Sequence, residues 1–236
     1  SIFNEKSIIL PLGEVKITKK VNSLLIVLRM NTNIEIWDQN RRRLFEYPKI
    51  EYTKRSLNSL IRSINFLKKK HPTINVKTII VDDNSSTENL NIVKKVIDGY
   101  NIEIINLDYS KYEKKISEQK NKETFANLAS LLQSFEIGKD NGEDLIYFIE
   151  DDYLHFESML EEMVTSFERI ASQLNKDIFM CPSDYPYLYM SNAKTNVLIG
   201  NKRHWRTVNK TLCTLMTTKN LLDKYWDNFY KNCLDR

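Results

Sequence analysis

The stretch Tyr147-Phe148-Ile149-Glu150-Asp151-Asp152 joins a run of apolar residues directly to three consecutive carboxylates. The run over residues 145–149 is rich in aromatic and branched side chains, which predicts a buried strand with the carboxylates at its carboxyl end. A second stretch has the same form: Ile79-Ile80-Val81 leads into Asp82-Asp83, and Asn84-Ser85-Ser86-Thr87 follow. Hydroxyl side chains in that position commonly cap a helix. Both stretches therefore indicate strands whose acidic ends precede helices.

Strand-sized and helix-sized apolar patterns alternate around these two stretches. We expect strands at residues 23–31, 76–81, 102–107, 145–149, 177–181 and 211–217, and helices at residues 53–70, 87–97, 124–138, 157–174 and 219–233. This alternation is typical of an α/β fold with a mostly parallel sheet, helices on its faces and right-handed crossovers. In such sheets ligands bind beyond the carboxyl ends of the strands, where both acidic stretches are expected.

The clear periodicity ends near residue 180. Residues 184–209 are rich in Tyr, Asn and Arg and show no regular pattern. We therefore expect one domain over residues 1–236, with a nucleotide-binding half at about 23–180 and an irregular substrate half at about 181–236. The first residues, Ser1-Ile2-Phe3-Asn4, contain no initiator Met and no cleavable signal, so we expect a processed terminus cut from a longer protein.

Composition narrows the class of protein. The 236 residues carry 35 basic and 31 acidic side chains, a mild balance that suits binding of anionic phosphates at one site and predicts no nucleic-acid surface. The three cysteines form no C-x-x-C pair, which argues against a disulfide scaffold or structural zinc and favours a reducing cytoplasm. Only five glycines are present, and neither a G-x-G-x-x-G fingerprint nor a Walker loop occurs. No apolar run approaches the roughly 18 residues of a membrane span, although the aromatic stripe over residues 221–230 leaves peripheral membrane contact open.

The carboxylates of Glu150, Asp151 and Asp152 indicate a metal site. Two such charges repel by about 1 kcal/mol even in water, and a divalent cation removes that repulsion. Mg²⁺ and Mn²⁺ prefer oxygen ligands and usually share them with substrate phosphates. The alternative is a solvated acidic turn that stabilises the start of the next helix. The pair Asp82 and Asp83 also has two interpretations: contact with a base or ribose, or a solvated turn before a capped helix.

In their order and spacing, the two stretches resemble the GT-A-type nucleotide-sugar glycosyltransferases, and family 2 most of all. Members of that family typically show a strand ending in I-P-x-Y-N, then V-x-V-D-D-G-S-x-D, then L-D-D-D. Residues 27–31 (VLRMN) keep the final Asn, residues 80–86 (IVDDNSS) match with Asn84 in place of Gly, and residues 149–152 (IEDD) match with Glu150 in place of the first Asp. The resemblance covers about residues 23–180.

The resemblance implies a GT-A-like, Rossmann-like fold and a metal-dependent enzyme of the hexosyltransferase type. Its donor would be a nucleoside diphosphate sugar of the UDP or GDP type, and its acceptor a hydroxyl group of a glycan, lipid-linked or protein acceptor, with inversion at the anomeric carbon. Asp152 would hold Mn²⁺ or Mg²⁺ against the two phosphates, and Glu150 would approach the ribose or the metal. The side chains expected to contact the donor are Arg29, Asn31, Asp82, Asp83, Glu150, Asp151, His204 and Arg206.

The irregular half supplies the expected acceptor chemistry. Asp184 lies between Pro182 and Pro186, which restrict the backbone, and we expect it to be the general base; the alternative is an ordinary turn residue. Asp223 and Asp227 are further candidates for the base, although their helical spacing favours a surface position.

The segment His204-Trp205-Arg206 stands in a cationic stretch with Arg203 and Lys210. Arg206 could bind diphosphate oxygens and His204 could complete the metal shell, as a downstream His does in some GT-A enzymes. The alternative is a basic surface loop over a packed Trp. The basic cluster of residues 41–43 could form a lid, or could simply be solvated.

Three other functions remain open from sequence. A sugar-phosphate nucleotidyltransferase would use a similar sheet but usually carries a Gly-rich loop after the first strand, which residues 29–31 do not supply. A receiver-type signalling domain would need a phospho-accepting Asp at a strand end about 45 residues after the first acidic pair, where residues 127–129 are predicted to be helical. A glycosyltransferase-like domain that binds nucleotide without turnover is the third.

Overall fold

The computed structural model describes residues 15–33, 47–116, 122–190, 194–211 and 214–234, and a five-stranded sheet forms its centre. The strands lie in the order β3-β2-β1-β4-β7, where β4 pairs antiparallel with β7 and the other neighbours are parallel. The mostly parallel sheet predicted from the alternating pattern is thus confirmed. The strand bounds are β1 (Ser23–Met30), β2 (Asn75–Asp82), β3 (Ile102–Asn106), β4 (Leu145–Glu150) and β7 (Leu215–Thr218).

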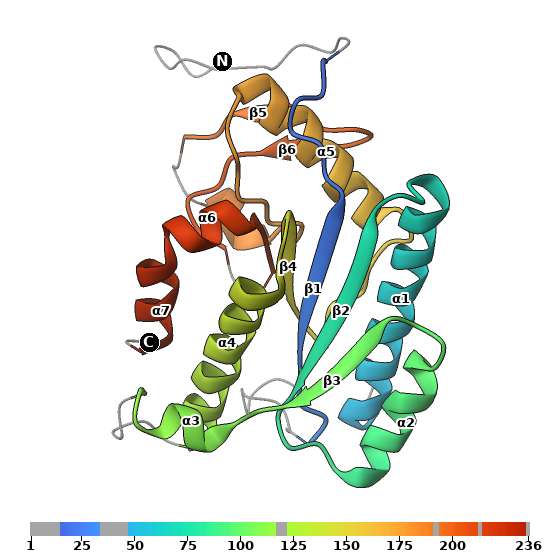
Figure 1. Cartoon of the computed structure of the whole chain (residues 1–236), viewed down its shortest axis with the longest axis vertical. Coiled ribbons are helices and arrows are strands. Elements are labelled where there is room, and N and C mark those ends of the chain that lie inside the picture. Colours follow the sequence, from blue (N-terminus) through green and yellow to red (C-terminus); the bar gives the residue numbers. More distant parts are fainter. Residues whose placement is uncertain (1–14, 34–46, 117–121, 191–193, 212–213, 235–236) are drawn as a thin grey trace.

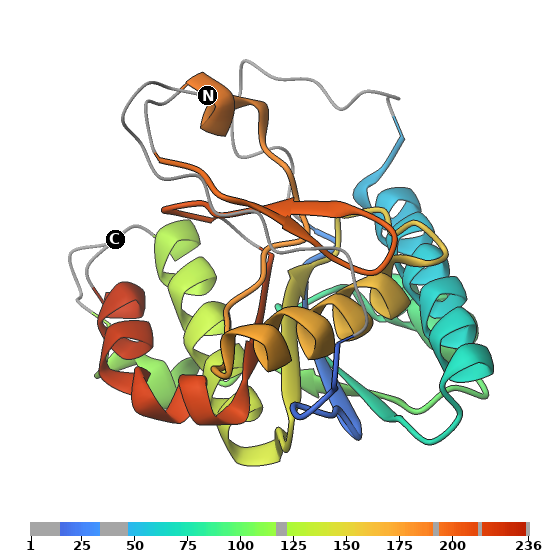
Figure 2. The same ribbon diagram turned by 90° about the horizontal axis from the view of Figure 1, so that it is seen from above.

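Helices cover both faces of the sheet (Figures 1 and 2). On one face lie α1 (Lys49–Lys70), α2 (Thr87–Ile97) and α5 (Met159–Leu174). On the other face lie α3 (Tyr109–Glu113), α4 (Lys122–Asn141), α6 (Lys219–Lys224) and α7 (Trp226–Leu234).

Strand β1 supplies both hydrophobic cores because successive side chains of a strand point to opposite faces. Leu24, Ile26 and Leu28 pack with α1 and α5, whereas Leu25 and Val27 pack with α4. A central parallel strand that is buried on both faces has a nearly continuous apolar sequence, and residues 23–30 show such a sequence.

The chain reverses its direction across the sheet between β1 and β4. It first passes from β1 to β2 and β3, and then α4 carries it back to β4 on the other side of β1. The carboxyl ends of β1 to β4 meet at the lower end of the sheet in Figure 1. Such a reversal is the place where open α/β sheets bind ligands.

The irregular half contains structure that the sequence pattern did not predict. The 3₁₀ helix η1 (Pro186–Met190) and a hairpin of β5 (Val197–Ile199) with β6 (His204–Arg206) occupy it. The hairpin packs on α5 through Trp205, whose indole N–H lies 3.1 Å from the Ser166 Oγ. Gly200 permits this approach, because a Cβ atom there would lie 2.3 Å from the same oxygen. Long-range packing therefore fixes strands that are too short to show a period.

Three predicted elements were wrong in detail. The strand expected at residues 211–217 begins only at Leu215, since residues 211 and 214 lie outside it. Residues 177–181 form no strand; Met180 alone makes a bridge to Met216 of β7. The helix expected over residues 219–233 is divided at Tyr225, whose backbone (φ −107°, ψ 22°) leaves the helical region between α6 and α7. The division turns the α7 side chains toward α4, with which they share a core.

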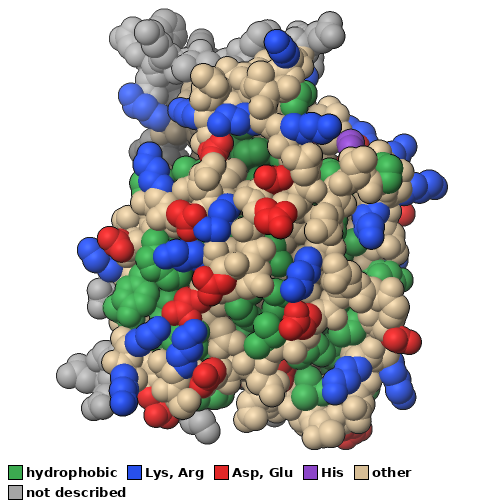
Figure 3. Space-filling view, in the orientation of Figure 1, with side chains coloured by type: hydrophobic (Ala, Val, Ile, Leu, Met, Phe, Trp, Pro, Cys, Tyr) green, Lys and Arg blue, Asp and Glu red, His purple; other side chains and the backbone are tan. Residues whose placement is uncertain are grey.

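Within the described ranges, none of the helices combines the length and the apolar character needed to cross a membrane. Basic and acidic side chains alternate over the face of the molecule seen in Figure 3.

Candidate functional site

Arg29 and Glu150 form an ion pair between β1 and β4, where the chain reverses its direction across the sheet. The two residues are register partners on β1 and β4, and both side chains lie on the α4 side. The Arg29 guanidinium also donates to the Asn127 Oδ1 at 2.8 Å and the Ser130 Oγ at 3.2 Å, both on α4. Glu150 thus has a fixed cationic partner within the protein, and Arg29 is held in one position by three side chains.

Asp151 points to the opposite face and is 5% exposed. Its Oδ1 lies 2.7 Å from the Lys49 Nζ, and the Thr53 hydroxyl donates to its Oδ2 at 2.7 Å. Burial raises the pKa of Asp151, and the bonds from Lys49 and Thr53 oppose that shift. Both oxygens are therefore engaged with the start of α1, although Asp151 was expected to contact the donor.

Asp152 is exposed at the end of β4, and its carboxylate has no hydrogen-bond or ion-pair partner among the described residues. The next residue, Tyr153, brings its hydroxyl to within 2.8 Å of the Tyr185 hydroxyl. This contact places the acidic tip of β4 beside the segment that carries Asp184.

The three metal ligands expected from sequence are not assembled. In the described ranges, no three His, Cys, Asp or Glu side chains converge on a point that could hold a metal ion. Glu150 pairs with Arg29, and His204 lies exposed on β6. A single exposed carboxylate at Asp152 fits Mg²⁺ or Mn²⁺, since these ions are commonly held by one or two carboxylates together with substrate phosphates.

A second cluster joins the ends of three strands. The Asn31 amide donates to one oxygen of Asp83 at 2.9 Å, and the Tyr109 hydroxyl donates to the other. The Tyr109 ring also lies 6.0 Å from that of Phe125, measured between centroids. Burial and the neighbouring Asp83 carboxylate hold the pKa of Tyr109 far above its ordinary value. Asn31 and Asp83 were both expected to contact the donor, whereas Tyr109 was missed; an aromatic residue just beyond a strand end was its only signal.

Asp82 has a different position from Asp83. It is buried, its Oδ2 accepts the Ser85 N–H at 3.1 Å, and burial raises its pKa. Ser86 caps α2 by accepting the Asn89 N–H at 3.2 Å. Between Asp82 and Ser86, Asn84 has a φ of 58°, in the left-handed region that Asn tolerates better than most residues. This explains why Asn can stand where the family motif has Gly.

Asp184 has two partners. The Arg206 guanidinium lies 3.0 Å from its Oδ1, and the Tyr189 hydroxyl donates to its Oδ2. Both lower the pKa of Asp184, with Tyr189 contributing more. The carboxylate is still 59% exposed, so an incoming hydroxyl group could reach it.

His204 and Arg206 occupy alternate positions of β6 and so share the face opposite Trp205, and His204 is exposed. Asp223, the alternative base, pairs with Lys219 on α6. The basic cluster at residues 41–43 lies outside the described residues.

No family model matches the chain, and no curated protein matches it. Among solved structures it is similar to S. aureus TarS 1–349 (14% identity, TM-score 0.44), over 86% of this chain and 48% of that one. It is similar to the galactosyltransferase LgtC in complex with donor and acceptor sugar analogues (12%, TM-score 0.39), over 90% of this chain and 66% of that one. It is also similar to glucosyl-3-phosphoglycerate synthase from Mycobacterium tuberculosis in complex with UDP (11%, TM-score 0.33), over 62% of this chain and 40% of that one. This chain thus spans 40% to 66% of their lengths.

Proposed function

We propose that this chain is a metal-dependent glycosyltransferase that moves a sugar from a nucleoside diphosphate sugar to a hydroxyl acceptor, with inversion. The observation that carries the proposal is the arrangement of side chains at the carboxyl ends of the strands, where the chain reverses its direction across the sheet. The Asn31–Asp83–Tyr109 cluster lies on one side of the β1 end, and the exposed Asp152 lies at the end of β4 on the other. A nucleoside at the cluster would direct its diphosphate toward Asp152.

The nucleoside would be recognised by Asp83 and Asn31. Asp83 is buried and accepts two hydrogen bonds, so a base N–H or ribose hydroxyl could replace the Tyr109 donor without leaving the carboxylate unpaired. The rings of Tyr109 and Phe125 would then offer a stacking surface for the base. The donor base is of the uracil or guanine type in this proposal.

Asp152 would hold the Mn²⁺ or Mg²⁺ ion together with the diphosphate. The bound ion supplies charge neutralisation for the diphosphate leaving group. Arg206, which is half-buried, and His204, which is exposed, lie on the same face of β6. They are the cationic and metal-binding side chains that would approach the diphosphate from the second half of the chain.

Asp184 is the proposed general base. Its carboxylate is exposed, and the Tyr153–Tyr185 contact places its segment beside the tip of β4. An acceptor hydroxyl that displaces Tyr189 would donate its proton to Asp184, and transfer of Arg206 toward the diphosphate would raise the basicity of the carboxylate. A glycan, a lipid-linked sugar or a protein hydroxyl could serve as the acceptor.

The nucleotide site is tested by thermal-shift titration with UDP, GDP and the corresponding nucleotide sugars, with and without Mn²⁺. At about 100 times the dissociation constant, a ligand stabilises the folded state by about 2.7 kcal/mol. Asp83→Asn should remove most of that stabilisation, whereas Asp140→Asn, an exposed position on α4, should leave it unchanged. If every nucleotide leaves the melting temperature unchanged, or stabilises Asp83→Asn as strongly as the parent protein, the proposed site is wrong.

A further inference from the structure

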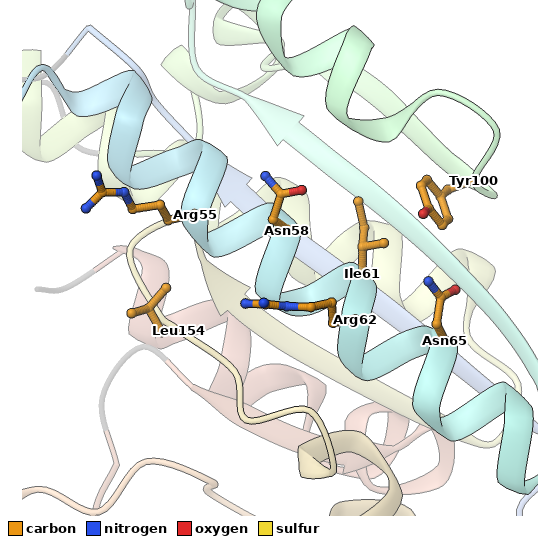
Figure 4. Close-up of a pocket in the computed structure, with 7 residues that line it drawn as sticks. All are labelled: Arg55, Asn58, Ile61, Arg62, Asn65, Tyr100 and Leu154. Atoms are coloured by element: carbon orange, nitrogen blue, oxygen red, sulfur yellow. The ribbon is translucent and has the colours of Figure 1, made fainter.

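The outer face of α1 carries a row of basic and amide side chains. Arg55, Asn58, Arg62 and Asn65 recur three or four positions apart, and all four are exposed. They line a pocket together with Tyr100, which follows α2, and with the loop after β4 (Figure 4). In Figure 4, Leu154 of that loop and Tyr100 stand on opposite sides of α1.

This helix is strongly positive. It contains seven Lys or Arg residues and a single acidic residue, Glu51. Lys49 and Lys54 are engaged with Asp151 and Glu51. In the described part of the chain, no acidic side chain forms an ion pair with Arg55 or Arg62, nor with the three lysines at residues 68–70.

Two large apolar side chains project from the loop beside this row. Leu154 is 72% exposed and Phe156 is 70% exposed, on the loop between β4 and α5. The Phe156 ring lies 5.4 Å from the guanidinium carbon of Arg203, at the turn of the β5–β6 hairpin. Exposed apolar side chains bordered by Arg residues are the combination that peripheral proteins present to anionic lipid surfaces.

We propose that the surface formed by Arg55, Arg62, Leu154, Phe156 and Arg203 docks on a bilayer of anionic phospholipids. The arginines would bind headgroup phosphates, and the two apolar side chains would enter the boundary between headgroups and acyl chains. The charge of the row and the apolar tips together favour a bilayer over a soluble polyanion, which would leave Leu154 and Phe156 in water. The inference does not depend on the proposed glycosyl transfer. Docking would nevertheless bring Asp152, two residues before Leu154, close to the membrane.

The test is co-sedimentation of the whole chain with vesicles of phosphatidylcholine alone or with about 30% phosphatidylglycerol. A basic side chain at an anionic surface is worth about 1 kcal/mol, or about fivefold in the partition coefficient, so Arg55→Gln with Arg62→Gln should weaken binding about 25-fold. The matched control is Lys224→Gln with Lys231→Gln, which removes the same charge from exposed positions on α6 and α7 across the sheet. It should change binding by less than about twofold.

Leu154→Ser with Phe156→Ser should weaken vesicle binding at least about tenfold at unchanged charge, because it removes the inserted apolar surface. Equal thermal melting of all variants shows that they are folded. The proposal is overturned by absence of binding to the phosphatidylglycerol vesicles, or by an equal loss of binding in the lysine control. It is also overturned if the double Ser variant binds vesicles as tightly as the parent protein. The same holds if soluble polyphosphate binds as tightly as the vesicles and competes fully with them, since the site would then recognise anions without a bilayer.

Discussion

Asp151→Asn should destabilise the protein without removing the proposed nucleotide site. The substitution keeps the shape of the side chain and the bond from Thr53, but it removes the charge that faces Lys49 at 2.7 Å. The side chains of Lys49 and Asp151 are 14% and 7% exposed, so water replaces the lost partner poorly. Removing one member of a buried ion pair costs about 3–5 kcal/mol, and the partial access of Lys49 to water places this pair near about 3 kcal/mol.

For a chain of this length, each kcal/mol lowers the melting temperature by about 2–4 °C, so Asp151→Asn should melt about 6–12 °C lower. Lys49→Met alone should have a similar effect because it leaves the carboxylate buried without its cation. The double variant should recover to within about 1 kcal/mol of the parent protein, since neither charge then remains. Urea denaturation of all four proteins gives the coupling free energy of the pair, which we expect to be at least about 2 kcal/mol.

Asp152→Asn is the matched control because it makes the same chemical change one residue later. Its carboxylate is exposed, so the free energy of unfolding should change by less than about 0.5 kcal/mol. Its Mn²⁺-dependent stabilisation by nucleotide should be lost, whereas Asp151→Asn should keep that stabilisation. If Asp151→Asn melts like the parent and loses nucleotide binding, then Asp151 is a ligand and the structural assignment of its pairing with Lys49 is refuted.

Three further predictions concern the buried His155, whose Nε2 lies 3.3 Å from the Tyr147 hydroxyl, and the Tyr109 and Asp184 groups of the proposed site. Burial lowers the pKa of His155 to about 4, below its ordinary 6.5. The free energy of unfolding should therefore be complete above pH 6.5 and fall by roughly 3 kcal/mol as the pH drops to 4. Urea denaturation should show a smaller fall in His155→Gln, and an equal fall in that variant would contradict the prediction. Tyr109→Phe should weaken UDP or GDP binding in calorimetry about three- to tenfold, whereas Tyr112→Phe on the same helix, whose hydroxyl bonds Glu136, should leave affinity unchanged. Asp184→Asn should lower turnover at least about 100-fold with donor affinity retained, and normal turnover in this variant would place the base elsewhere. Arg206→Gln removes a group that lowers the pKa of Asp184, so it should move the acidic limb of the kcat/KM profile to higher pH.

The sheet and its main helices could be predicted because their signals are local. The apolar run at residues 23–30 and the exact bounds of α2 follow from periodicity and a Ser cap. The different directions of the three carboxylates could also have been derived from strand alternation. Ile149 packs in the core shared with α1, so Asp151, two residues on, belongs to that face, and Glu150 belongs to the face of α4.

The partners of those carboxylates could not be predicted from sequence. Lys49 and Asp151 are 102 positions apart, and Tyr109 is 26 positions from Asp83. Nothing in the local pattern of either residue specifies the other, because the contact exists only once the sheet has formed. The β5–β6 hairpin has the same origin, since Trp205 finds its partners on α5.

The distribution of charge at the tip of β4 connects the fold to the proposed chemistry. Glu150 is paired with Arg29 and Asp151 with Lys49, so two of the three adjacent carboxylates are matched by cations of the protein. Asp152 remains as an unmatched negative charge at the point where the sheet would receive a diphosphate, which is also negative. Repulsion between them would oppose binding unless a cation lies between them, and Arg206 is already bonded to Asp184. In the proposed reaction a divalent ion would therefore be the missing partner, and nucleotide affinity should depend on that ion far more than on Glu150 or Asp151.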